Sequence, residues 1–121
     1  MPQSTLVSLV RHGQVENPEY IFYGRLPYFG LSAAGQQEAR KAAGRLQNLR
    51  LAAVFSSPLL RARQTAREIL KQHPRLRLHI SGLITEVCSV YEGGPARESD
   101  ARRGDIYTGT PEPFEQPADV F

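Results

Sequence analysis

A chain of 121 residues, of which 40% are apolar and 22% charged, has the size and composition of one soluble globular domain with a modest core. No apolar run approaches the roughly 20 residues of a membrane helix, and the amino terminus lacks the basic and apolar regions of a signal peptide. The single cysteine, Cys88, excludes an internal disulfide and suits a reducing compartment. We therefore expect a cytoplasmic protein that does not enter a membrane.

The net charge is +3, and arginine supplies most of the positive charge because Lys41 and Lys71 are the only lysines. Guanidinium groups bind phosphate and carboxylate groups as a fork, whereas lysine acts as a point charge. No basic stripe with interleaved aromatic residues is present, so we expect no nucleic-acid partner. The arginines could bind a small anionic substrate. Alternatively, they could simply form a solvated, positively charged surface.

The first predicted elements alternate between strand and helix. Thr5–Val10 (TLVSLV) is short, apolar and β-branched, which predicts a strand buried on both faces. A loop with several glycine and proline breakers follows over residues 14–31. Ser32 can cap a helix that runs to about Leu49, with apolar residues at helical spacing on one face. Ala52–Ser56 (AAVFS) is predicted to form a second short strand.

Ser57 and Pro58 predict the start of a second helix, with serine as the cap and proline at the first helical position. The helix is expected to end near His73, and the alternating residues 76–80 predict a third strand. Strands that alternate with helices indicate a parallel sheet covered by helices on both faces. Residues 92–121 are polar and rich in proline and glycine. We expect one α/β domain over residues 1–121, incomplete in appearance, with 92–121 as a tail or cap.

Chemically versatile residues follow the predicted strands, at the edge where ligands of parallel α/β sheets bind. Arg11, His12 and Gly13 leave the first strand. Arg61 lies in the first turn of the helix after the second strand, and Glu86 follows the third strand. Such a set could transfer a phosphoryl group, because arginines neutralise phosphate oxygens, an imidazole nitrogen attacks phosphorus and a carboxylic acid protonates the leaving alkoxide.

Four segments resemble, in the same order, the histidine phosphatase superfamily, the phosphoglycerate mutase-like proteins with an Arg-His-Gly motif. They are LVRHG (9–13), YGRLPYFGLSAAGQQEA (23–39), FSSPLLRARQTA (55–66) and, more loosely, LITEVCSVYEG (83–93). The combination of RHG with SSPLxRAxQTA makes the resemblance specific. It implies a three-layer α/β/α phosphoglycerate mutase-like fold with a mostly parallel sheet, apparently truncated in this chain, and no metal or organic cofactor.

The resemblance also implies roles for matching residues. His12 would be the nucleophile that forms a phosphohistidine, and Arg11 and Arg61 would grip the phosphate. Glu86 would donate a proton to the leaving group, with Glu92 as a competing candidate.

Three further residues match substrate contacts of the family. Asn17 resembles a polar phosphate contact, although the commonest spacing after RHG is one residue longer, and a plain Asn-Pro turn is the alternative. Tyr23 and Gly24 match a stretch that lines the substrate in some members.

The family pattern has a second catalytic histidine in a strand that ends in SHG, and this motif does not occur in the sequence. In the family's sheet that strand lies between the first and second strands, so each of these would expose an unpaired edge here. The chain is then a fragment, or it pairs its strands differently, or another chain fills the gap through homo-oligomerisation or strand exchange. We expect the isolated chain to be weakly active or inactive.

The leading hypothesis is a phosphomonoester hydrolase that acts on a small phosphorylated substrate through His12. Mutase-type phosphoryl transfer is an alternative, disfavoured because RHGQVEN lacks the Glu-Ser pair and the tryptophan common after RHG in glycolytic mutases. A non-catalytic or truncated phosphate-binding module is the other alternative, and the absent second histidine favours it.

Overall fold

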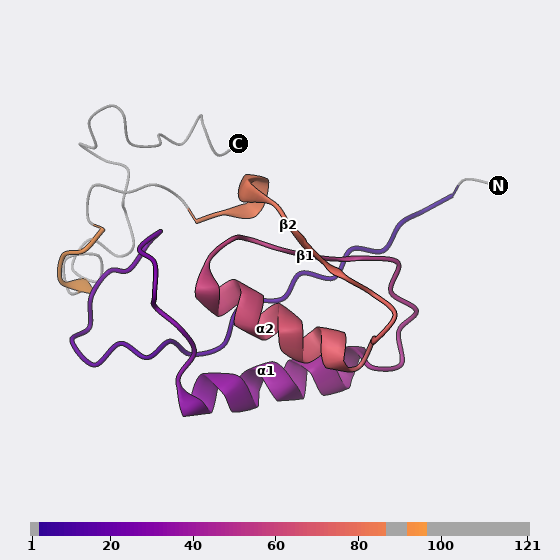
Figure 1. The fold of residues 1–121 in the computed structure, drawn as a ribbon, viewed down its shortest axis with the longest axis horizontal. Helices are drawn as coiled ribbons and strands as arrows, with labels where there is room; N and C mark the ends of the chain where they lie inside the picture. Colours follow the sequence, from indigo (N-terminus) through magenta and orange to yellow (C-terminus); the bar gives the residue numbers. More distant parts are fainter. Residues whose placement is uncertain (1–2, 87–91, 97–121) are drawn as a thin grey trace.

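A computed structural model describes residues 3–86 and 92–96 of the chain (Figure 1). The elements in these ranges, in chain order, are α1 (Ala33–Leu46), β1 (Val54–Ser56), α2 (Leu60–Lys71), β2 (Leu78–Ile80) and the 3-10 helix η1 (Gly82–Ile84). Cys88 and residues 97–121 of the predicted tail or cap lie outside the described residues. No helix of the described ranges is long and apolar enough to cross a membrane.

The predicted parallel sheet is present, and α2 connects its two strands. Val54 pairs with Leu78, Phe55 with His79 and Ser56 with Ile80. Side chains alternate between the faces of a strand, so Phe55 and His79 share one face, where their rings stack with centroids 5.0 Å apart. Both described helices lie on one side of the sheet, with α1 packed against α2 (Figure 1). The α/β class is confirmed, and the described ranges supply the helical layer on one face.

The predicted strand at residues 5–10 is absent from the structure. No backbone hydrogen bond joins residues 3–10 to another described residue, and the side chains of Leu6, Val7 and Leu9 are 83%, 70% and 94% exposed. A strand needs a partner for its backbone N–H and C=O groups. Within the described ranges, β1 and β2 pair only with each other. The apolar pattern is that of a strand, but among the described residues nothing pairs with it.

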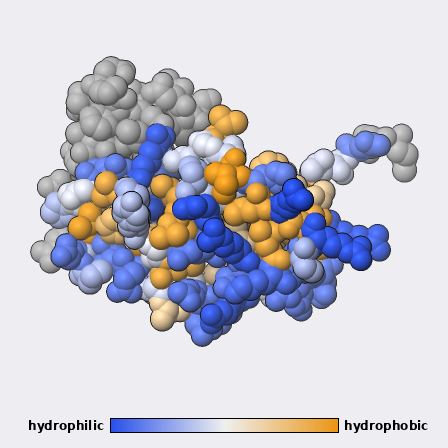
Figure 2. Space-filling view, viewed as in Figure 1, coloured by the Kyte–Doolittle hydropathy of each residue, from blue (hydrophilic) through white to orange (hydrophobic). Residues whose placement is uncertain are grey.

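Apolar side chains are also exposed around the sheet. Phe55 and Ile80 of the strands and Leu83 of η1 are 62%, 51% and 96% exposed. Figure 2 shows apolar atoms gathered on this face of the molecule, in the region of β1, β2 and η1. A large exposed apolar surface of this kind is typical of a face that packs against another segment or another molecule.

The start of α1 follows the prediction, because Ser32 caps the helix by accepting a hydrogen bond from the Gly35 N–H at 3.0 Å. The helix ends at Leu46, three residues before the predicted end at Leu49. One face of α1 packs through the buried Ala39 and Ala43. Small side chains on this face allow α1 to approach α2 closely.

The predicted serine cap of α2 is wrong. The N-cap is Leu59, which has extended backbone and no side-chain hydrogen bond, and the helix starts at Leu60. Ser57 is buried in the turn before it, where its carbonyl accepts a hydrogen bond from the Ser56 hydroxyl at 2.7 Å. The extended backbone continues to Leu59, and Arg61 is buried in the first turn of α2.

Candidate functional site

The turn after His12 is fixed by contacts with both helices. The Gly13 N–H donates to Thr65 Oγ1 at 3.3 Å, and the Thr65 hydroxyl donates to the Arg61 carbonyl at 2.9 Å. A Cβ on Gly13 would overlap the carbonyl of Gly35, so glycine is required where this turn meets the start of α1. Backbone packing therefore positions His12 even though no strand precedes it in the described structure.

The half-buried His12 ring has a defined hydrogen bond. Its Nδ1 lies 2.7 Å from the Gly13 carbonyl oxygen. A carbonyl can only accept, so we assign the proton of the neutral imidazole to Nδ1 and the free lone pair to Nε2. The ring also packs edge-on against Tyr23, with centroids 6.3 Å apart and an interplanar angle of 63°. Nε2 of His12 is thus the nitrogen available as a nucleophile or base.

Arg61 is a buried cation. Its side chain is only 1% exposed, and its guanidinium carbon lies 4.4 Å from the centroid of the Tyr23 ring. Nη2 donates to the Gly24 carbonyl, whereas Nε and Nη1 have no hydrogen-bond partner in the part of the chain that is described. Burial lowers the pKa of Arg61, and the charges of Glu86, Tyr23 when ionised, and Glu92 oppose this shift. Arginine still keeps its charge at neutral pH, so Nε and Nη1 remain hydrogen-bond donors that could bind an acceptor.

The loop that carries Tyr23 and Gly24 is braced by residues 92–96. An isolated antiparallel bridge pairs Ile21 with Pro95. Around it, the Phe22 N–H donates to the Gly94 carbonyl at 2.8 Å, the Gly93 N–H to the Phe22 carbonyl at 2.8 Å, and the Ala96 N–H to the Tyr20 carbonyl at 2.9 Å. The described part of the predicted tail or cap therefore holds the site loop in place.

Asn17 closes the same loop from its other end. Its Nδ2 donates to the Ile21 carbonyl at 2.9 Å, and its Oδ1 accepts from the Ile21 N–H at 3.0 Å. Both the oxygen and the nitrogen of its amide thus form hydrogen bonds within the loop. This agrees with the alternative prediction that Asn17 is a turn residue. Asn17 also lines the cleft beside His12, so a phosphate contact would have to share these hydrogen bonds.

A cleft of about 420 Å³ opens beside His12. Its lining includes Arg11, His12, Asn17, Tyr20, Tyr23 and Glu38. The side chain of Arg11 is exposed at this cleft, whereas Arg61 lies buried beneath the Tyr23 ring. In residues 3–86 and 92–96, no three His, Cys, Asp or Glu side chains gather into a possible metal site.

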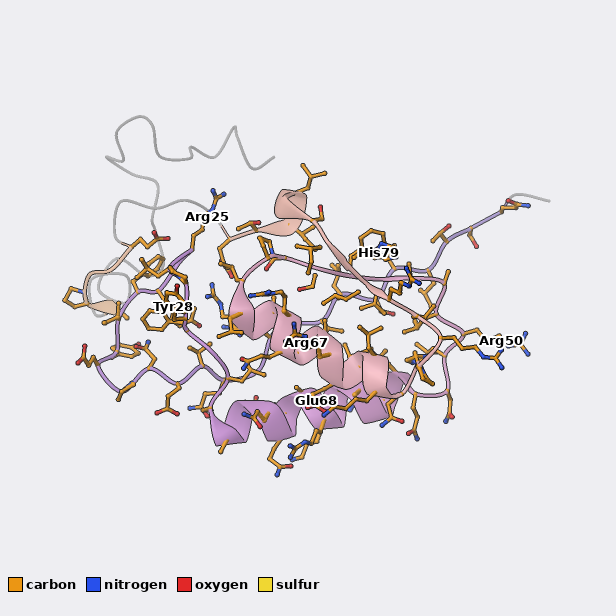
Figure 3. All side chains as sticks on the ribbon, in the orientation of Figure 1. Arg25, Tyr28, Arg50, Arg67, Glu68 and His79 are labelled. Carbon is orange, nitrogen blue, oxygen red and sulfur yellow. The ribbon has the colours of Figure 1, made fainter. Side chains whose placement is uncertain are left out.

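Glu86 lies at the margin of this site. Its side chain is exposed, and its main-chain carbonyl accepts from Nε of Arg25, which the loop carries towards η1 (Figure 3). The negative charge of Glu86 opposes the lowering of the Arg61 pKa that burial causes. The structure thus brings His12, Tyr23, Gly24 and Arg61 together, with Arg11 and Asn17 on the cleft and Glu86 beside them.

Two residues of α2 join the site without standing out in the sequence. Thr65 binds the turn after His12, as described above. Gln64 accepts a hydrogen bond from the Leu31 N–H at 2.7 Å and so holds the end of the site loop. Their spacing from Arg61 could have identified them, because residues three and four positions apart lie on the same face of a helix. Arg67 falls on another face and is exposed (Figure 3).

Comparisons with known proteins agree on one family. The family model described as Histidine phosphatase superfamily (branch 1) matches residues 7–118. The uncharacterised protein Rv0525 of Mycobacterium tuberculosis is 43% identical over 93 residues, which cover 77% of this chain and 46% of that protein. A 2,3-bisphosphoglycerate-dependent phosphoglycerate mutase of Pseudoalteromonas atlantica is 36% identical over 103 residues, covering 81% of this chain and 44% of the mutase.

Among solved structures, the native mycobacterial glucosyl-3-phosphoglycerate phosphatase Rv2419c is similar to this chain with a TM-score of 0.71 and 25% identity. The match covers 90% of this chain and 55% of that one. The chain therefore spans about half the length of the relatives and structures that it matches.

Proposed function

The chain belongs to the histidine phosphatase superfamily and has its phosphoglycerate mutase-like α/β fold, and from this premise we propose that it forms the phosphate-binding part of a phosphomonoesterase site that acts through His12. The observation that carries the proposal is the state of Arg61. A buried guanidinium with two unpartnered donors, in contact with the same Tyr23 ring as His12, is unfavourable alone and is stabilised by an anion.

In the proposed reaction, Nε2 of His12 attacks the phosphorus of a small phosphorylated substrate. The bond from phosphorus to the leaving oxygen breaks, and the protonated Glu86 carboxyl supplies a proton to that oxygen. Water then attacks the phosphohistidine and gives its proton to Glu86, which releases inorganic phosphate and restores the imidazole.

The arginines would stabilise the charge that this reaction develops on the phosphate oxygens. Arg11 reaches them from the open side of the cleft, and Arg61 offers Nε and Nη1. Since the Tyr23 ring lies over the Arg61 guanidinium, we expect the ring to move aside when phosphate binds.

Binding of inorganic phosphate tests this proposal without requiring turnover. We expect the chain to bind phosphate, and Arg61→Lys to weaken binding at least about tenfold, because lysine cannot present the same fork of donors. Arg67→Lys, on the exposed face of the same helix, is the matched control and should bind as the wild type does. Equal affinities for the two variants, or no binding by the wild type, would contradict the proposal.

Two alternatives can be tested separately. The similarity to a phosphoglycerate mutase favours phosphoryl transfer between positions of a sugar acid, and a coupled mutase assay with 3-phosphoglycerate would detect it. A phosphate-binding module without catalysis is the other alternative, which would bind phosphate but show no turnover of p-nitrophenyl phosphate. Action in the cytoplasm, suggested by the single cysteine, is part of the proposal.

A further inference from the structure

The peptide unit between Gly24 and Arg25 is bound on both of its sides. Its carbonyl accepts a hydrogen bond from Nη2 of Arg61, and its N–H donates to Oε1 of Glu92. A peptide unit is planar, so its carbonyl and N–H turn together. The carboxylate of Glu92 is therefore connected to the guanidinium of Arg61 through one rigid group.

The local backbone is shaped to admit this carboxylate. Gly24 has a φ of +44°, in the left-handed region that favours glycine. A Cβ at this position would lie 2.5 Å from Oε1 of Glu92. Glycine thus satisfies two requirements here, the backbone conformation and the close approach of Glu92.

Glu92 also enters the site from a fixed backbone. The next residue, Gly93, donates its N–H to the Phe22 carbonyl at 2.8 Å, so the two segments are joined beside the peptide unit. The half-buried side chain of Glu92 therefore has little freedom to leave its partner. A hydrogen bond to a carboxylate polarises the peptide and strengthens the bond that its carbonyl accepts from Arg61.

We propose that Glu92 is a positioning residue, which holds Arg61 through the Gly24–Arg25 peptide so that Nε and Nη1 stay available to bind phosphate. This inference rests on the proposed function of Arg61. The role requires only an acceptor oxygen at Oε1 and no proton, which distinguishes it from the proton-donor role that Glu92 shares as a candidate with Glu86.

Substitution by glutamine separates the acceptor from the charge. Glu92→Gln keeps an oxygen for the Arg25 N–H and removes a negative charge near an anion site, so phosphate affinity should stay within about twofold of wild type or increase. Glu92→Ala removes the acceptor and should weaken phosphate binding about tenfold. Glu19→Ala, at an exposed glutamate earlier in the same loop, is the matched control and should leave the affinity unchanged.

The NMR signal of the Arg61 Nε–H gives a second readout in the absence of any ligand. We expect a distinct signal in the wild type and in Glu92→Gln, and an exchange-averaged one in Glu92→Ala. Gly24→Ala should reproduce the alanine result, because its Cβ displaces Oε1. If Glu92→Ala does not fold, Glu92→Asp, one methylene shorter, replaces it with the same expectation.

The outcomes separate this inference from the proposed function. If the wild type binds phosphate and Glu92→Ala changes neither affinity nor the Arg61 signal, positioning by Glu92 is refuted while the phosphate site stands. Equal weakening in Glu92→Gln and Glu92→Ala would also overturn it, since charge alone would then matter. If the wild type binds no phosphate but the Arg61 signal still follows the acceptor at position 92, positioning is supported and the function fails.

Discussion

At the scale of single residues, burial decides what Arg61 and His12 do. Both contact the ring of Tyr23, but His12 is half-buried and borders a cleft, whereas Arg61 is 1% exposed. A buried cation whose donors lack partners lowers stability and favours any anion that reaches it. The two residues therefore predict different consequences of substitution.

Replacing Arg61 with methionine should separate stability from binding. Methionine fills a similar volume without a charge, so the free energy of unfolding should stay level or rise by about 1 kcal/mol. Phosphate binding should be lost in the same variant. Urea denaturation followed by circular dichroism measures the first effect, and a large loss of stability would show that the contacts of Arg61 with Tyr23 and Gly24 outweigh its desolvation.

Replacing His12 with alanine should remove any turnover of p-nitrophenyl phosphate and leave the binding of phosphate analogues partly intact. The imidazole is the proposed nucleophile, whereas the arginines supply most of the attraction for the anion. Steady-state rates and vanadate binding, measured on the same preparation, test the two parts. Turnover at the original rate would show that His12 is not the nucleophile.

At the scale of elements, α1 and α2 hold the site through close backbone approach and polar side chains rather than through a large apolar core. The buried apolar residues of the described ranges are few, and half of them are alanines: Val15, Leu31, Ala39, Ala43, Ala66 and Ile69. The start of α1 meets the turn after His12, and α2 binds that turn through Thr65. Two glycines of α1 test how much this close approach contributes.

Gly35 and Gly44 lie in the same helix but in opposite surroundings. A Cβ on Gly35 would overlap the Gln14 carbonyl, whereas a Cβ on Gly44 meets nothing within 4 Å. Gly35→Ala should therefore lower the free energy of unfolding by about 1–3 kcal/mol and weaken phosphate binding. Gly44→Ala should raise it by about 0.5–1 kcal/mol because alanine favours helix. Thermal unfolding of both variants gives the comparison, and equal shifts would exclude the close approach.

At the scale of the whole molecule, two apolar surfaces are exposed. One is segment 3–10, and the other is the sheet surface around Phe55, Ile80 and Leu83. The chain covers about half of the length of its relatives. The backbone of segment 3–10 has no hydrogen-bond partner among residues 3–86 and 92–96, so it can accept a strand from elsewhere. Homo-oligomerisation or strand exchange through these surfaces remains our proposal for what the chain does at high concentration.

Leu9→Lys probes these surfaces directly. The Leu9 side chain is 94% exposed, so the substitution should leave the stability of the isolated chain nearly unchanged and reduce its self-association. Analytical ultracentrifugation over a range of concentrations measures the association. A marked loss of stability in the variant would show that Leu9 is buried by a partner in the native assembly.

The order of elements could be read from the sequence because their signals are local. Ser32 caps α1 through a hydrogen bond three residues away, and the alternation of helix and strand implies a parallel pair. The segment 5–10 has the pattern of a strand, but pairing depends on distant residues. The turn at Ser57 likewise continues to Leu59, because tertiary packing draws Arg61 inward.

The sequence by itself determined the family, the β-α-β order and the residue types of the site, since these depend on motifs and on neighbours within a few positions. Only the tertiary structure decided that Arg61 is buried beneath Tyr23 and linked to Glu92 through the peptide after Gly24. Those contacts join residues 37 to 67 positions apart along the chain, and no local pattern encodes which of many arginines and glutamates will meet. Burial turns an ordinary arginine into a candidate anion site, and burial is a property of the fold.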